Sequence, residues 1–178
     1  YWSKFQTDII FAENKSQVNL LVKEGIKRES IVIVGNPVLD NAFAKSKKLS
    51  KKINNKLNIL FITVNISGGQ GKSKWTKSKR NKMTKELADK FNNVPNTKLT
   101  IKIHPTSENY KEYENMLESF KNVNLNQIDD IVDLLEKSDI VITPCTTTAA
   151  TIALVMKKPI IIWNHFQVMG DLLLRKGF

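Results

Sequence analysis

The sequence predicts an α/β fold: a Rossmann-like, mainly parallel sheet with helices on both faces. Residues 59–64 (ILFITV) form an uninterrupted apolar run, which is typical of a strand buried on both faces. After this run, short β-type segments alternate with helical segments of about ten residues, the pattern of βαβ units. The 178 residues are enough to bury a substantial core. Cys145 is the single cysteine, so the chain has no internal disulfide and must fold without one.

The first 44 residues precede a lysine-rich boundary and contain short elements of their own. Residues 8–12 form a short β-type run, and a helix is expected over 15–23 because Gly25 is a natural helix stop. Residues 31–34 (IVIV) are β-branched throughout and predict a second strand. After the glycine and proline that follow this strand, residues 38–44 are expected to begin another helix.

Residues 45–58 (KSKKLSKKINNKLN) are polar and lysine-rich, so we expect a basic linker between two domains. Between Lys45 and Lys90 there are 14 basic residues and two acidic ones, so the net charge of +11 is concentrated there. Such a patch could attract nucleic acid, anionic lipid or a phosphorylated substrate, or simply form a solvated surface. The chain has no RNA-stacking aromatic motif and no zinc-finger spacing, so nucleic acid is not an expected partner.

Residues 59–178 read as a second α/β domain. Apolar, β-branched runs predict its strands at 59–64, 98–103, 123–125, 140–142 and 160–163. Helical periodicity and flanking turn residues predict its helices at 77–91, 108–120, 128–137 and 148–156.

Three threonines follow the predicted strand 140–142, where ligands of open parallel sheets bind. Thr146, Thr147 and Thr148 surround the start of an apolar helix, whose unpaired N–H groups and partial positive charge suit a phosphate. One threonine is enough to cap the helix. The other two could bond a ligand or only stabilise the turn.

His104 directly follows the strand 98–103, and Pro105 prevents that strand from continuing. A histidine at this edge can donate a hydrogen bond to phosphate or transfer a proton, or it can be a turn residue bonded to nearby backbone. His165 also follows a strand, but no neighbouring pattern supports a role for it.

The loop after strand 59–64 contains Gly68, Gly69, Gln70, Gly71 and Lys72. It suggests a P-loop, but the spacing fails, because the first glycine of that pattern would fall at Ile66. The glycines are compatible with a loop that contacts phosphate or faces an acceptor, and equally with an ordinary mobile loop.

No metal site is expected. The chain has no Cys/His cluster with zinc spacing, and Asp129, Asp130 and Asp133 open a helix whose dipole favours acids. Cys145 has no histidine near it in sequence, so we expect a small buried residue and not a nucleophile. No apolar run approaches the length of about 18 residues that a membrane-spanning helix needs, and the start of the chain does not resemble a signal peptide. We therefore expect a soluble protein, and the single cysteine fits a reducing cytoplasm.

Four segments, taken in order, resemble the GT-B superfamily of nucleotide-sugar enzymes. This superfamily includes UDP-N-acetylglucosamine 2-epimerases and transferases similar to CDP-glycerol glycerophosphotransferases and capsule sialyltransferases. Residues 25–40 resemble the end of the amino-terminal domain, and 58–64 resemble the first strand of the carboxyl-terminal one. Residues 102–105 (KIHP) match the His-Pro motif, and 130–162 resemble the donor-binding block.

The resemblance implies that residues 59–178 are a GT-B-type carboxyl-terminal half, a nucleotide-binding Rossmann-like domain that is truncated at its end. It implies that residues 1–44 are a remnant, the end of the amino-terminal Rossmann-like domain. It implies that His104 and the three threonines contact the donor phosphates, and that Asn126, Gln127 and Ile128 border the base. Most of the first domain would be missing, so the catalytic residues are unknown. Epimerases usually show Asp-Ser-Gly-Gly where this chain has the run 145–148 (CTTT), which favours a transferase.

The expected function is therefore the donor-binding part of a transferase. The full protein would move a sugar or glycerol phosphate from a nucleotide sugar or CDP-activated donor to a cell-surface glycan or lipid-linked acceptor. The donor is a substrate, and no cofactor is expected. The lysine-rich segment suggests the further hypothesis of contact with the inner face of the membrane. Two alternatives remain open: an enzyme like UDP-N-acetylglucosamine 2-epimerase, and a non-catalytic nucleotide-binding module.

Overall fold

The computed structural model describes residues 7–48, 55–64, 76–106 and 108–163. The chain divides into two compact units, Tyr1–Asp40 and Asn41–Phe178. The predicted linker 45–58 overlaps regular structure at both ends. Helix α2 (Asp40–Ser46) includes its first two residues, and strand β3 (Leu57–Ile62) includes its last two.

The first unit is a small parallel βαβ element. Strands β1 (Ile10–Ala12) and β2 (Ile31–Ile33) pair in parallel, with Ile10 opposite Ile31, and helix α1 (Lys15–Lys23) connects them. The asparagine side chain at position 14 caps α1, and Gly25 takes a φ of +92° just beyond its end, a conformation that glycine adopts without steric cost. Short 3-10 turns occupy Arg28–Ser30 and Pro37–Leu39.

The second unit contains five strands and the helices between them, and the predicted elements of 59–163 are all present. After β3 come α3 (Lys77–Asn92), β4 (Thr97–Lys102), α4 (Tyr110–Leu117), β5 (Val123–Asn126), α5 (Ile131–Lys137), β6 (Ile140–Thr143), α6 (Thr148–Val155) and β7 (Ile160–Ile162).

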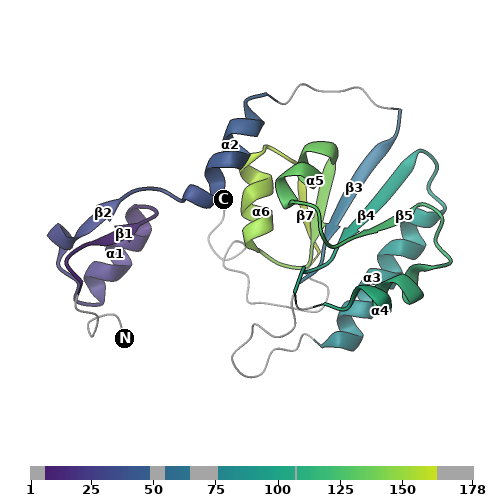
Figure 1. The fold of residues 1–178 in the computed structure, drawn as a ribbon, viewed down its shortest axis with the longest axis horizontal. Coiled ribbons are helices and arrows are strands. Elements are labelled where there is room, and N and C mark those ends of the chain that lie inside the picture. The colour runs from purple at the N-terminus through teal and green to yellow at the C-terminus, as the bar shows by residue number, and fades with distance from the viewer. Residues whose placement is uncertain (1–6, 49–54, 65–75, 107, 164–178) are drawn as a thin grey trace. The chain divides into compact units, whose positions relative to one another are not determined.

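The five strands form one parallel sheet in the order β5-β4-β3-β6-β7. Helices α3 and α4 lie on one face, and α5 and α6 lie on the other (Figure 1). Residues that alternate along β3 and β4 point to the first face, where Phe61 and Ile101 pack against Met83 and Tyr113. The expected Rossmann-like sheet with helices on both faces is confirmed.

Polar side chains set where the helices begin. The residues before α3, α4, α5 and α6 each accept a hydrogen bond from a backbone N–H of the first turn; they are Thr76, Asn109, Asp130 and Thr147. Because Asp130 is the cap of α5, the expected helical start at 128 is wrong by three residues. Ile128 precedes the helix and is 95% exposed instead of packing on an apolar face.

Candidate functional site

The predicted phosphate contacts gather at the carboxyl end of the sheet. The chain moves outward from β3 to β4 and β5, then returns to the other side of β3 with β6 and β7. The strand order thus reverses between β3 and β6, and ligands of open α/β sheets bind at such a point. His104 follows β4 and the threonines follow β6, and both strands pair in parallel with β3. These residues therefore lie along the same edge of one sheet.

The three threonines at this edge have different roles. Thr147 is half-buried, and its side chain caps α6 by accepting from the Ala150 N–H at 3.1 Å. Thr146 and Thr148 are exposed. The expectation that one threonine would serve as the cap is confirmed, and Thr147 is that residue. Thr146 and Thr148 are the exposed residues beside this cap at the start of α6.

The half-buried His104 begins a turn with Pro105 and Thr106, which we call the His104 turn. Its Nδ1 lies 3.4 Å from the backbone nitrogen of Thr106 and accepts from that N–H. A neutral imidazole that accepts at Nδ1 carries its proton on Nε2. The Thr106 hydroxyl oxygen also lies 3.4 Å from Nδ1, so both groups of Thr106 meet this nitrogen, and the backbone bond favours the tautomer with a donor at Nε2. His104 is therefore also a turn residue bonded to nearby backbone, as the alternative interpretation expected.

A buried carboxylate that the sequence analysis did not identify lies behind this turn. The side chain of Glu108 is 0% exposed. Its Oε1 accepts from the Tyr113 hydroxyl at 2.6 Å and pairs with the Arg80 guanidinium at 3.0 Å. Its Oε2 accepts from the Thr63 hydroxyl and from the His104 backbone N–H, the latter at 2.5 Å. One carboxylate therefore joins the end of β3, helix α3, the His104 turn and helix α4.

A second, more exposed carboxylate balances the other side of Arg80. Glu112 accepts from Asn81 at 2.6 Å and pairs with Lys77 at 2.8 Å, and its Oε1 lies 3.8 Å from Arg80. The hydrogen bond from Lys77 is the main cause that lowers the pKa of Glu112. Burial, followed by the negative charge of Glu108, raises the pKa of Tyr113 well above its usual value, so the phenol is a fixed donor.

The predicted base-binding residues divide into structural and exposed groups. The side-chain Nε2 of Gln127 lies 3.1, 3.2 and 2.9 Å from the backbone oxygens of His104, Pro105 and Glu108. Gln127 therefore supports the His104 turn. Asn126 bonds to Asp129 at 2.9 Å, while Ile128 is 95% exposed.

Lys102 closes this arrangement from the opposite face of the sheet. It is 8% exposed, and its Nζ donates to the Gln127 carbonyl at 2.5 Å. Burial lowers its pKa, and the nearby charges of Asp129 and Asp130 oppose that shift. The loop after β5 is thus tied to the end of β4.

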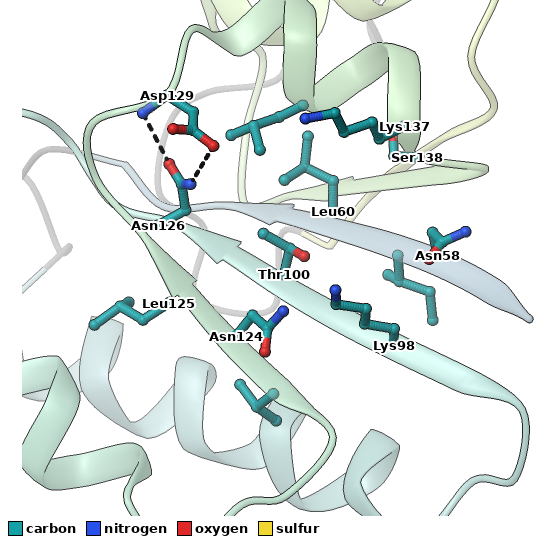
Figure 2. A pocket seen from close by; sticks show the side chains of 13 residues that line it. Asn58, Leu60, Lys98, Thr100, Asn124, Leu125, Asn126, Asp129, Lys137 and Ser138 are labelled. Carbon is teal, nitrogen blue, oxygen red and sulfur yellow. Dashed lines mark hydrogen bonds between the residues drawn. The ribbon is translucent and has the colours of Figure 1, made fainter.

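A cavity of about 420 Å³ lies over the face of β3, β4 and β5 on the side of α5. Figure 2 shows Lys98 and Thr100 from β4, Asn124 from β5 and Lys137 from α5 around it. The cavity shares only Asn126 with the predicted site residues and does not include the His104 turn or the threonines. It is therefore distinct from the predicted phosphate contacts at the carboxyl edge.

Several other expectations concern the remaining chemistry. The loop from Gly68 through Gly69, Gln70 and Gly71 to Lys72 lies outside the described residues. Within the described ranges, no group of three His, Cys, Asp or Glu side chains is placed to hold a metal ion. Cys145 is 3% exposed and belongs to the core, as expected. In the same ranges, none of the helices combines the length and the apolar character that crossing a membrane requires.

Arg80 and Glu108 are the residues of this site that sequence reasoning missed. Arg80 lies three and four positions before Met83 and Thr84, on the buried face of α3, and is an arginine among lysines. Its position on that face was the available signal. Glu108 follows His104 by four residues, and nothing in its sequence context distinguishes it from a surface glutamate.

Comparisons with known proteins identify the fold and the family. The family model of UDP-N-acetylglucosamine 2-epimerase matches residues 5–163. No curated protein matches the chain. Among solved structures, the Neisseria meningitidis UDP-GlcNAc 2-epimerase bound to UDP-GlcNAc is similar with 22% identity and a TM-score of 0.64. It is covered over 44% of its length, against 88% of this chain.

Two further structures extend this similarity. The S. aureus MnaA–UDP complex has 21% identity and a TM-score of 0.58, with 88% of this chain and 42% of that chain covered. A variant of the wall teichoic acid polymerase TagF has 15% identity and a TM-score of 0.51, with 90% and 40% covered. The chain thus spans less than half the length of these structures. The expected resemblance to the GT-B superfamily is confirmed.

Proposed function

This chain belongs to the UDP-N-acetylglucosamine 2-epimerase family, and from that premise we propose that its second unit binds the diphosphate of a nucleotide-activated sugar. The site is the carboxyl edge of the sheet, between the His104 turn and the start of α6. The main support for this proposal is that β4 and β6 both pair in parallel with β3. His104, which follows β4, and the threonines, which follow β6, therefore lie at the same edge of the sheet.

The chemistry of these groups suits a diphosphate. The Nε2–H of His104 and the exposed hydroxyls of Thr146 and Thr148 are hydrogen-bond donors, and the N-terminus of α6 adds partial positive charge. Ile128 is an exposed apolar side chain that follows β5, and the nucleotide base could pack against it. UDP and CDP are the ligands to titrate, because the proteins that the sequence resembles use UDP-activated and CDP-activated donors.

The binding experiment is a titration of the full-length protein with UDP, CDP and the corresponding nucleosides, followed by amide chemical shifts. We expect His104→Ala and Thr146→Ala each to lower the affinity for UDP or CDP about tenfold and to leave the affinity for the nucleosides nearly unchanged. Thr151→Ala, on the exposed side of α6, is the matched control. Equal diphosphate affinity in all four proteins would remove His104 and Thr146 from the site.

For the reaction of the whole protein we propose transfer of a sugar or glycerol phosphate to a glycan or lipid-linked acceptor. The run 145–148 carries threonines in place of the Gly-Gly usual in epimerases. In transfer, an acceptor hydroxyl oxygen forms a bond to the sugar carbon, or to the phosphorus of glycerol phosphate, and loses its proton to solvent. The bond to the departing nucleotide breaks, and its electron pair stays on the nucleotide phosphate. The donors at the start of α6 would stabilise that charge.

Epimerisation of a UDP-N-acetyl sugar is the second candidate, because the family model favours it directly. The two reactions differ in their need for an acceptor. The full-length protein is incubated with UDP-N-acetylglucosamine alone, and the nucleotide sugars are separated by chromatography. An epimer formed without acceptor would establish epimerisation and reject transfer. A donor consumed only when acceptor is added would do the reverse.

A third proposal concerns location. Helix α3 carries exposed lysines at 77, 82 and 85, within the basic segment 45–90. These charges would favour the anionic inner surface of a membrane, where a lipid-linked acceptor is found. Binding to phosphatidylserine vesicles at low salt that is lost at high salt would support this location. Equal binding to neutral vesicles would reject it.

A further inference from the structure

We propose that Glu108, paired with Arg80, is the positioning residue of the His104 turn, fixing the imidazole for its contact with the donor diphosphate. This inference rests on the proposed function. The residue itself does not face the ligand, because its side chain is 0% exposed and lies behind the turn.

The contacts of Glu108 show why it acts on the turn. Each carboxylate oxygen accepts from two donors. Oε1 binds Arg80 and the Tyr113 hydroxyl, both of which belong to helices of the packed core. Oε2 binds the Thr63 hydroxyl and the His104 N–H, both at the carboxyl edge of the sheet. The carboxylate therefore transmits the fixed position of two helices to the backbone of His104.

The backbone position of His104 in turn determines its ring chemistry. The ring Nδ1 accepts from the Thr106 N–H at 3.4 Å only while the turn keeps its shape, and this bond leaves the proton on Nε2. A turn that loosens would release Nδ1 and let the proton occupy either nitrogen. Positioning thus sets both the direction of the ring and the identity of its donor.

The charge of the pair gives the arrangement its stiffness. Arg80 is 5% exposed at its side chain, and it also donates to the Asn81 Oδ1 at 2.9 and 3.1 Å. Removing the Glu108 carboxylate would therefore leave the buried guanidinium with Glu112, at 3.8 Å, as its charged partner among the described residues. The guanidinium also lies 4.9 Å from the centre of the Tyr113 ring, which helps to fix its plane. Buried charge-assisted hydrogen bonds of this kind are shorter and stronger than neutral ones.

Glu108→Gln is the informative substitution. A glutamine offers one oxygen and one NH₂ group, and the oxygen is retained by the charged Arg80. The NH₂ group then faces the His104 N–H, so two donors meet and the turn loses its acceptor. Glu112→Gln is the matched control: it removes the same charge from the other side of Arg80, but Glu112 has no contact with the His104 turn among the described residues.

The test uses the full-length protein and two measurements. The first is affinity for UDP or CDP in the wild type, His104→Ala, Glu108→Gln and Glu112→Gln. The second is the ¹⁵N spectrum of the imidazoles, in which His104→Ala assigns the signal. We expect Glu108→Gln to lower the affinity for UDP or CDP about tenfold and to shift the tautomer equilibrium of His104. Glu112→Gln should change the affinity by no more than about twofold and leave the His104 signal in place.

The outcomes separate this inference from the proposed function. If His104→Ala weakens the diphosphate and Glu108→Gln does not, the positioning role is rejected and the binding site stands. If neither variant matters, the phosphate contact itself is rejected, and the positioning role with it. Equal losses in Glu108→Gln and Glu112→Gln would assign the effect to the charge of Arg80 and reject positioning. Should Glu108→Gln fail to fold, a wild-type His104 signal with its proton on Nδ1 would still refute the inference.

Discussion

Replacing Thr147 by alanine tests whether the capping role and the binding role at α6 belong to different threonines. The substitution removes one hydrogen bond, from the Ala150 N–H to the Thr147 hydroxyl at 3.1 Å, at a half-buried helix start. Loss of such a cap costs about 1 kcal/mol, within a range of about 0.5–2. For a chain of this size we expect the melting temperature to fall by about 2–4 °C.

The assay is thermal unfolding of Thr147→Ala, Thr147→Ser and Thr148→Ala, followed by circular dichroism. Serine keeps the accepting oxygen and should restore most of the loss. Thr148 is exposed and is the first helical residue, so its replacement should change stability by less than about 0.5 kcal/mol. Equal destabilisation by Thr147→Ala and Thr148→Ala would refute the assignment of Thr147 as the cap.

Three further predictions concern the core, the acid limb of stability and the exposed isoleucine. Leu135→Ala, at a 0% exposed position, should lower the unfolding free energy by about 2–5 kcal/mol in urea titrations, while Leu154→Ala at 58% exposure should cost far less. The pKa of Glu112 is lowered chiefly by its hydrogen bond from Lys77, so its contribution to the unfolding free energy is complete above the ordinary value of about 4.5 and is lost as pH falls through the folded-state value. Glu112→Gln should therefore reduce the loss of stability at acid pH, and an unchanged dependence of stability on pH would contradict this. Ile128→Ser should leave the melting temperature within about 2 °C of the wild type and weaken UDP or CDP, whereas unchanged affinity would exclude a base contact at this position.

The fold could be predicted largely because its signals are local. The apolar run before Thr63 and the β-branched run before Thr143 are the strands of a parallel sheet, as their composition indicates. Errors fall at element ends. The predicted helix at 128–137 began with Ile128 because its apolar side chain fitted the helical period, but Asp130 offers a side-chain cap that starts the helix later.

The edge of the candidate site could be predicted for a geometric reason. In a parallel sheet, every residue that directly follows a strand comes to the same edge, whatever its side chain, so placing His104 and Thr147 needed only the strand assignments. The division of roles among the threonines could not be predicted in the same way. It depends on which hydroxyl reaches the Ala150 N–H, a distance that local sequence does not determine.

The interior of the site is a different problem, because it depends on buried charge. Periodicity identifies which face of a helix is covered, and this criterion would have placed Arg80 inside, next to Met83 and Leu87. A buried arginine requires an acidic partner, and the sequence offers many acids at comparable spacing. Only the packing of α3 against α4 selects Glu108, since its carboxylate is the one that meets the guanidinium, the Tyr113 hydroxyl and the turn together. A polar group that is buried at the end of a strand and has every acceptor position occupied therefore has a consequence beyond stability: it can transmit the rigidity of the core to the His104 turn, which we propose contacts the donor diphosphate.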